Sequence, residues 1–359
     1  MKIIFDEAIG KFNDLVFSLY MLENMNLMHE ITNEYGIELD KDIVRFIENV
    51  GKWTGLDREK LRFFFHDYNN GTQLVSIGGA TLGYEEHRID NFNQVLMDIE
   101  KKEDEELIKN LIKSILYSII GNSNLVNEKY KEICSNKRDI IEYIKNLSYT
   151  PEEKWNLFLF IDEPKKYALE LCNFLKLYRP IFEKYYKNLD KIREKFNKYL
   201  KEKIEGEGIE YLNNLSKVIP YKQFEKIYIY PLYIGFCSIN YNMVDEKTIF
   251  LGIGFKYEDS VLKRLKDNDE YDKYNLILKV ISDKSKFNII KLLMEREMYG
   301  MEIAEKLKLT TATVSHHMSQ LFLAEIVLMD KQEGKVYYKL NKETLKSTIK
   351  YLNNQFKLD

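Results

Sequence analysis

Proline, glycine and cysteine are all scarce in this chain of 359 residues, which contains 5, 16 and 3 of them, respectively. So few prolines and glycines exclude a collagen-like or low-complexity chain and disfavour a sandwich of many tight turns. The cysteines, Cys134, Cys172 and Cys237, lie far apart and form no Cys-x-x-Cys pair, so a disulfide framework is excluded. This cysteine usage favours a reducing, cytoplasmic setting.

The chain also lacks a long hydrophobic run and an excess of one charge. Its most apolar stretch, residues 157–161, is far shorter than the ~20 residues that cross a bilayer, and its start lacks the apolar segment of a signal peptide. We therefore expect a cytoplasmic protein with no membrane partner. Lys and Arg (54) nearly balance Asp and Glu (57), so a nucleic-acid site would have to be a local patch.

Helical periodicity dominates the first 205 residues. Apolar side chains recur every three or four positions in residues 12–22, 103–120 and 164–204, which predicts amphipathic helices. Pro180 lies inside the last of these segments, so we expect a kink or a break there.

The pattern changes after residue 208. Residues 226–230 and 248–255 are rich in β-branched and aromatic side chains, and residues 240–247 between them have turn chemistry, which predicts two or three antiparallel strands. The predicted fold is mainly α, with a helical N-terminal domain that carries a small antiparallel β element and a C-terminal winged helix-turn-helix. The predicted divisions are a sensor or regulatory domain at 1–260, a charged linker or helix at 261–274 and the winged helix at 275–359.

The winged helix is predicted from its order of elements. Asp283 can cap the second helix, Thr310 can cap a helix that ends near Leu323, and Asn341 can cap the last helix. Two strands, at residues 326–329 and 336–340, flank a polar tip. In such a motif the second helix of the helix-turn-helix pair enters the major groove of DNA.

Two segments of this region, LTTATVSHHM at residues 309–318 and EGKVYYKL at residues 333–340, resemble the ArsR/SmtB family of transcriptional regulators. The resemblance implies a regulator, more often a repressor, that binds a palindromic operator in double-stranded DNA. It assigns DNA contacts to the helix and the wing: Thr310, Thr311, Thr313, Ser315, His316, Ser319, Gln320, Lys331 and Lys335. The helix itself has no Lys or Arg, although residues 276–359 carry 14 Lys and Arg against 10 Asp and Glu.

Members of this family pair through the first and last helices of the winged helix, so the resemblance implies a homodimer. The positions with this role are Ile277, Val280, Ile281, Leu345, Ile349, Leu352 and Phe356. Many members also bind metals through a Cys-x-Cys pair, but the matching positions here are Tyr299 and Met301, and the last helix has no His. We therefore expect neither a metal site nor a cofactor.

The N-terminal region would then receive the signal, from a small molecule or a protein. Its aromatic residues, including Phe63–Phe65, Trp53 and Trp155, could line a pocket for a planar ligand, or they could simply form a large core.

Two other functions stay open at this point. The winged helix could bind a protein instead of DNA. His66-Asp67, with His29 upstream, could belong to a metal-dependent phosphohydrolase, although no second Asp completes that pattern. We expect no catalytic site and hence no enzyme.

Overall fold

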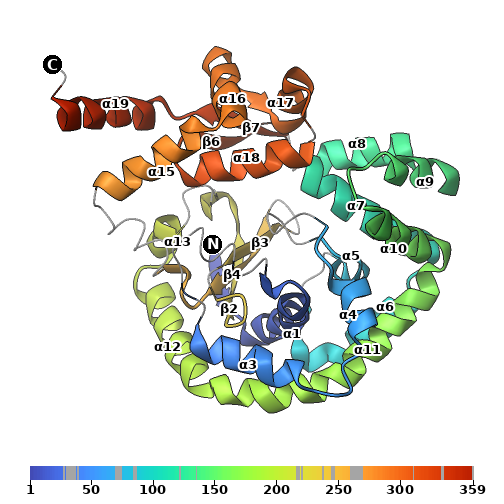
Figure 1. Cartoon of the computed structure of the whole chain (residues 1–359). Coiled ribbons are helices and arrows are strands. Elements are labelled where there is room, and N and C mark those ends of the chain that lie inside the picture. The colour runs from blue at the N-terminus through green and yellow to red at the C-terminus, as the bar shows by residue number, and fades with distance from the viewer. Residues whose placement is uncertain are drawn as a thin grey trace. The chain divides into compact units, whose positions relative to one another are not determined.

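A computed structural model describes the chain (Figure 1) except for residues 27–28, 30–37, 39, 69–74, 84–86, 121–122, 135, 216–218, 220, 237, 244–246, 259–269, 310, 333–334 and 358–359. It divides into two compact units, the first made of Met1–Leu111 and Ile144–Val261 and the second of Ile112–Tyr143 and Leu262–Asp359. The two units interleave along the chain, whereas the sequence analysis expected one division between residues 260 and 275.

The first unit contains, in chain order, β1 (Lys2–Phe5), α1 (Glu7–Glu23), α3 (Lys41–Gly51), α4 (Arg58–Phe65), α5 (Ile77–Leu82), η1 (Ile89–Asn91), α6 (Phe92–Lys101), the start of α7 (Asp104–Ile120), α10 (Pro151–Asp162), α11 (Pro164–Tyr186), η2 (Lys187–Leu189), α12 (Asp190–Gly206), α13 (Ile209–Leu215), η3 (Tyr221–Gln223), β2 (Lys226–Leu232), β3 (Ile239–Met243) and β4 (Thr248–Gly254). The second unit contains the rest of α7, α8 (Ser123–Ile133), α9 (Lys137–Lys145), α15 (Glu270–Ser282), α16 (Lys284–Glu295), β5 (Met298–Tyr299), α17 (Gly300–Leu307), α18 (Thr311–Leu323), β6 (Val327–Gln332), β7 (Lys335–Leu340) and α19 (Lys342–Phe356). The prediction of a mainly helical chain that ends in a winged helix is confirmed.

The sheet of the first unit has the strand order β1-β2-β4-β3. β1, β2 and β4 are parallel, and β3 is antiparallel to β4. The antiparallel prediction was therefore wrong for the two main strands, which pair Lys226 with Thr248 in the same direction. The physical reason is that β3 lies between β2 and β4 in the chain but pairs at the outer edge of β4, so the chain reverses direction twice and enters β4 parallel to β2. Strand β1 was not predicted.

α1 packs unusually closely against β2 because of Gly10. A Cβ atom at Gly10 would lie 2.1 Å from the carbonyl oxygen of Pro231, so no larger residue fits without moving the helix. One turn later, Asp14 points into the same contact, since residues four apart share a helix face.

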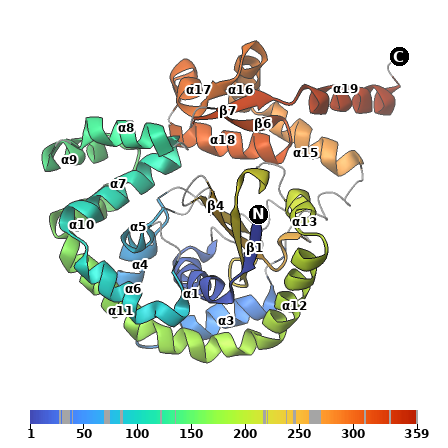
Figure 2. The same cartoon turned by 180° about the vertical axis from the view of Figure 1, so that it is seen from behind.

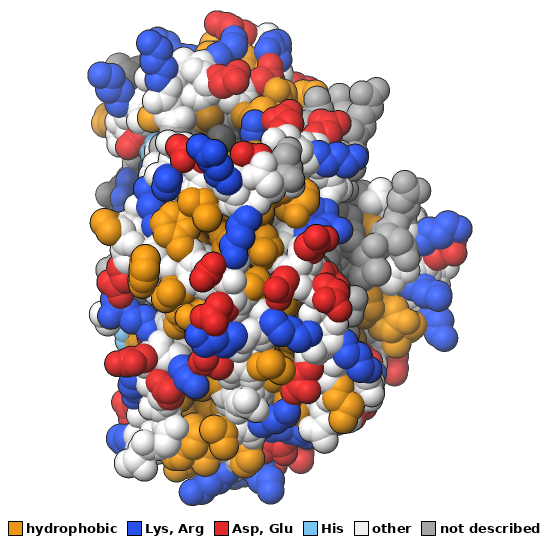
Figure 3. Space-filling view, turned by 90° about the vertical axis from the view of Figure 1, so that its right-hand side faces the viewer, with side chains coloured by type: hydrophobic (Ala, Val, Ile, Leu, Met, Phe, Trp, Pro, Cys, Tyr) orange, Lys and Arg blue, Asp and Glu red, His pale blue; other side chains and the backbone are white. Residues whose placement is uncertain are grey.

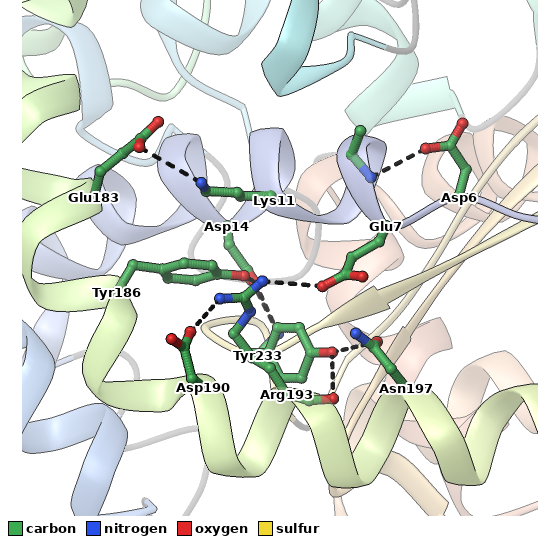
Figure 4. Close-up of polar contacts among 11 residues, drawn as sticks. Asp6, Glu7, Lys11, Asp14, Glu183, Tyr186, Asp190, Arg193, Asn197 and Tyr233 are labelled. Carbon is green, nitrogen blue, oxygen red and sulfur yellow. Dashed lines mark hydrogen bonds and ion pairs between the residues drawn. The ribbon is translucent and has the colours of Figure 1, made fainter.

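The carboxylate of Asp14 is fully buried at the end of β2 (Figure 4). It accepts hydrogen bonds from the hydroxyl of Tyr186 at 2.7 Å and from the backbone N–H groups of Tyr233 and Ile234 at 2.8–3.0 Å. The guanidinium of Arg193 lies over the Tyr186 ring and pairs with Glu7 at 2.9 Å. Burial raises the pKa of Asp14 to about 6, although these hydrogen bonds act in the opposite direction.

Helices α11 and α12 curve around α1 and the sheet in both Figure 1 and Figure 2. Contrary to one expectation, Pro180 does not interrupt α11, and the break comes instead at the 3-10 turn η2. Most of the large buried side chains are aromatic, among them Phe64, Phe65, Tyr178 and Phe182, so many of the aromatic residues form core. Of the helices that the structure describes, none is both long and apolar enough to cross a membrane.

Ionisation of Asp14 should make the stability of the first unit depend on pH. Because the folded-state pKa is raised from 3.8 to about 6, the contribution of Asp14 to the free energy of unfolding is largest below pH 4 and falls by about 3 kcal/mol as pH rises through 6. Asp14→Asn keeps an acceptor for the backbone N–H groups and cannot ionise. Denaturation between pH 4 and 8 should therefore show this decrease in the parent chain and in an Asp42→Asn control, but not in Asp14→Asn. An equal pH dependence in all three would contradict the prediction.

Candidate nucleic-acid interface

The first helix of the helix-turn-helix, α17, is fixed at its start by a charged pair. The Glu302 carboxylate accepts the Tyr299 backbone N–H at 3.4 Å and pairs with Arg296 at 2.5 Å, and this pairing lowers the pKa of Glu302. Ile303 and Ala304 are buried beneath the helix. These contacts set where α17 begins and which of its faces meets the core.

The turn after α17 depends on a residue with positive φ. Lys308 has φ +55°, and its N–H and that of Leu309 bond to carbonyls of the last turn of α17. Glycine is usual at such a position because it has no side chain to oppose the left-handed conformation. Thr310, the predicted cap of the next helix, lies outside the described residues.

Helix α18 has the predicted bounds and the predicted inner face. Val314, Met318 and Leu321, spaced i, i+4 and i+7, are all buried. They belong to one core with buried residues of α15, α16, α17, β6 and β7. The helix is thus held by apolar packing along one side.

The residues predicted to contact DNA are placed as follows. Thr313 and Gln320 are half-buried on α18. Thr311, Ser315, His316 and Ser319 also belong to α18, but their side chains lie outside the described part of the structure. The six predicted DNA contacts from Thr311 to Gln320 therefore all belong to one helix, and the orientation of four of these side chains lies outside the described part of the structure.

The wing is the antiparallel hairpin of β6 and β7, and β5 pairs with the other edge of β7. Gln332 pairs with Lys335 and Lys331 with Val336, so Lys331 and Lys335 lie at the tip end of the hairpin, although their side chains are not among those described. Partway along β7, the rings of Tyr337 and Tyr299 meet edge to face at 6.0 Å. The wing is thereby connected to the start of α17.

His317 of α18 influences the pKa of Asp283 at the start of α16, and sequence reasoning did not assign this interaction. His317 is half-buried and close enough to Asp283 to affect its carboxylate. Asp283 caps α16 by accepting the Lys286 N–H at 2.9 Å, which lowers the pKa of Asp283, and the charge of His317 lowers it further. The recognition helix is thus linked electrostatically to the start of α16. The spacing in the sequence could have indicated this, because His317 follows the inward-facing Val314 by three residues and therefore lies near the same face of the helix.

The residues predicted to form a dimer divide into two groups within a single copy of the chain. Ile277 and Val280 are buried in the winged-helix core, and Ile281, Leu345 and Leu352 pack partly against it. Ile349 and Phe356 are 60% and 67% exposed on α19. The buried rings of Tyr274 and Tyr351 stack at 4.1 Å, so α15 and α19 pack against each other at this point.

Charge is evenly mixed on the face drawn in Figure 3, where Lys and Arg alternate with Asp and Glu and no large area carries one sign. Such a surface does not by itself attract the phosphate backbone of DNA. The charges on this face alone therefore do not indicate a DNA-binding surface.

Comparison with known proteins agrees with this geometry. Residues 283–327 match the family described as bacterial regulatory proteins of the arsR family. The arsenical resistance operon repressor of Staphylococcus aureus is 35% identical over 83 residues, which are 23% of this chain and 80% of that protein. This chain belongs to the ArsR family. The corresponding repressor of Staphylococcus xylosus is 37% identical over 75 residues (21% of this chain, 72% of that protein), and the repressor SdpR of Bacillus subtilis strain 168 is 31% identical over 80 (22% and 89%).

The ArsR-family match, at residues 283–327, lies within the second unit, and the histidine and aspartate of the other candidate site lie in the first unit. There, the Nε2 atom of His66 lies 2.8 Å from Glu153, and the buried Asp67 accepts the Val75 backbone N–H at 3.4 Å. Within the described parts of the chain, no three His, Cys, Asp or Glu side chains are grouped so that they could hold a metal ion. His66 and Asp67 therefore have structural partners.

The strained turn before the wing provides a test of this ArsR-family fold. Glu325 has φ +55° and pairs with Lys273 at 3.4 Å on the surface. Glu325→Gly should stabilise the winged helix by about 1 kcal/mol, because the left-handed conformation costs about 1–2 kcal/mol for a residue with a Cβ. Glu325→Ala removes the same ion pair but keeps the strain, so it should be neutral or slightly destabilising in urea denaturation. Equal stability of the Gly and Ala variants would show that the strain is not relieved.

Proposed function

We propose that this protein is a DNA-binding transcriptional regulator, specifically a repressor, that reads its operator with helix α18. The observation that carries the proposal is the packing of α18: Val314, Met318 and Leu321 hold one side against the core, beside a two-stranded wing. Similarity to two arsenical resistance operon repressors and to SdpR, described as a transcriptional repressor, supports it. The DNA-contacting set is the predicted one on α18 and the wing.

The operator is proposed to be palindromic because the active form is proposed to be a homodimer. A two-fold axis would place two copies of α18 about 34–36 Å apart, one helical turn of DNA. The exposed Ile349 and Phe356 support pairing through α19, since one copy leaves them uncovered. A cytoplasmic location follows from the proposed contact with DNA.

Regulation is proposed to come from an effector that binds the first unit, a small molecule or a protein. An effector can act only if it binds one conformation of the chain more tightly than another. The pocket lined by Asp42, Arg45, Phe46, Asn49, Asn188 and Leu189 has a volume of 110 Å³, well below the ~300 Å³ typical of small-molecule sites. The pair Tyr299 and Met301 offers no thiolate, so a thiolate-bound metal or metalloid is not the proposed effector.

Binding to DNA from the region upstream of the protein's own coding sequence should weaken as salt rises, with a linear dependence of log affinity on log salt.

The triple variant Thr313→Ala, Ser315→Ala, His316→Ala should lose at least about tenfold in specific affinity, since one base contact contributes about 1–3 kcal/mol. The double variant Asn93→Ala, Gln94→Ala, on the exposed face of α6, is the control. Gel-shift titration measures the salt dependence of the parent chain and the affinities of the two variants. Absence of binding at all salt concentrations would favour the protein-interaction alternative.

Dimer formation can be tested separately from DNA binding. Ile349→Asp with Phe356→Asp should shift the chain from dimer to monomer in sedimentation at micromolar concentration, because two charges would then oppose burial at the interface. Both side chains are exposed in a single copy, so the melting temperature of the monomer unit should change little. Met294→Asp, at a position 61% exposed on α16, is the matched control and should remain dimeric. A parent chain that sediments as a monomer would refute the dimer.

A further inference from the structure

The end of α11, the turn η2 and the helix α12 carry lysines along their outer side. These lysines recur every three or four residues, which places them on one face of the helical segment: Lys184, Lys187, Lys191, Lys195 and Lys198. All five are exposed, whereas Phe196 and Leu200 on the opposite face of α12 are buried. Figures 1 and 2 show α12 at the outer rim of the first unit. We call these five residues the lysine stripe.

Few acidic side chains offset the positive charge of the lysine stripe. Residues 184–201 contain seven Lys and Arg against two Asp and Glu. One of these acids, Asp190, pairs with Arg193 at 2.5 Å, and just beyond the segment Glu202 lies 3.9 Å from Lys198. The three middle lysines of the stripe form no ion pair within the described parts of the chain. The stripe therefore presents a row of unpaired cations to solvent.

A small pocket adjoins the lysine stripe, because Asn188 and Leu189, which line it, stand between two members of the stripe in the chain. It has a volume of about 110 Å³, and its other lining residues are Asp42, Arg45, Phe46 and Asn49 of α3. Arginine and asparagine side chains donate hydrogen bonds to phosphate oxygens in protein–DNA complexes. The pocket thus offers donors for a single phosphate group, next to a row of cations.

The length of the lysine stripe fits an anion that repeats at regular intervals. From Lys184 to Lys198 the segment advances 14 residues, which is about 21 Å at a rise of 1.5 Å per residue. Each strand of double-stranded DNA carries one phosphate per ~3.4 Å of helix axis, so the stripe faces about six phosphates of one strand. Lysines that neutralise phosphates bind DNA without reading its sequence.

An anionic membrane fits the lysine stripe less well than DNA does. Helices that lie on membranes combine a basic face with large apolar side chains that enter the lipid. Between residues 184 and 201, all of which the structure describes, no large apolar side chain is exposed, and the nearest in the chain is Leu177. The stripe has charge to attract a polyanion but no apolar group to insert into a bilayer.

We propose that the lysine stripe is a second DNA-binding surface, which holds the phosphate backbone of double-stranded DNA without regard to sequence. Arg45, Asn49 and Asn188 hold one phosphate in the pocket, and the lysines contact its neighbours along the strand. The surface belongs to the first unit alone and requires no particular arrangement of the two units. The choice of DNA over RNA, which has the same phosphodiester chemistry, rests on the proposed function.

The test removes charge from the lysine stripe in the full chain. The stripe variant replaces its three middle members: Lys187→Gln, Lys191→Gln and Lys195→Gln. Glutamine and lysine have similar helix propensities, so the fold should be unaffected. The matched control replaces three exposed lysines that are spread over other parts of the first unit, and it has the same net charge: Lys52→Gln, Lys109→Gln and Lys222→Gln.

Fluorescence anisotropy with a labelled duplex of unrelated sequence measures sequence-independent binding over a salt series. In the stripe variant the slope of log affinity against log salt should be shallower by about 3, because each lost phosphate contact removes about 0.9. Affinity at ~0.1 M salt should fall at least about tenfold for the same reason. The control should behave as the parent chain does. Equal slopes in the two variants would overturn the proposal.

The pocket can be tested separately because two of its proposed donors are neutral. Asn49→Ala with Asn188→Ala should lower the affinity for the unrelated duplex several-fold and leave the salt slope unchanged, since no charge is removed. Unchanged affinity would overturn the placement of a phosphate in the pocket.

Two other polyanions are compared with DNA in the same variants. If the stripe variant lost affinity for a double-stranded RNA and kept its affinity for DNA, the assignment to DNA would be overturned. Vesicles that contain phosphatidylserine should not bind the parent chain more tightly than the stripe variant. Loss of vesicle binding in the stripe variant, with unchanged DNA binding, would instead identify a membrane surface.

Operator preference distinguishes failure of the lysine stripe from failure of the proposed function. The ratio of affinities for upstream and unrelated DNA should be the same in the stripe variant and the parent chain, because the stripe does not read sequence. The triple alanine variant of α18 should lose this preference. A parent chain without preference would contradict the proposed function, and the salt slopes on unrelated DNA would still decide whether the stripe binds DNA.

Discussion

The buried carboxylate of Asp14 is the interaction on which the first unit most depends. It can reach the end of β2 only because Gly10, one turn earlier, lets α1 approach the strand more closely than any side chain would allow. Once there, it accepts hydrogen bonds from two successive backbone groups after β2 and from Tyr186 of α11. One small residue and one acid thus fix a helix, a strand and the long outer helix relative to one another. The cost is a carboxylate whose ionised form is poorly solvated.

The winged helix is held together mainly by apolar packing and not by a buried charge. Its recognition helix is held by Val314, Met318 and Leu321, and apolar contacts of this kind depend little on pH. Two of its polar residues, Asp283 and Glu302, act at helix starts, where they set the boundaries of α16 and α17. A rise in pH through 6 should therefore affect the first unit before it affects the packing of α18.

The sequence predicts the second unit better than the first, because the features of the winged helix are local in the chain and those of the sheet are not. The bounds of α18 followed from its apolar spacing alone, and the caps Asp283 and Asn341 were found because capping is local. The parallel sheet could not be found in this way, because β1 pairs with β2 across more than two hundred residues and nothing local in residues 2–5 signals a partner. The membership of residues 112–143 in the second unit is equally non-local. The predicted contacts of α18 and the wing with DNA stay predictions.

An uncharged recognition helix places a constraint on how such a regulator could hold its operator. Residues 310–323 contain no Lys or Arg, so α18 contributes shape and short hydrogen-bonding groups with little attraction for phosphate. In the proposed complex, affinity would then come largely from Lys331 and Lys335 of the wing and from the two copies of the proposed dimer. When each single contact is weak, the distance and angle between the two copies determine the total affinity strongly, because a misplaced second helix contributes almost nothing.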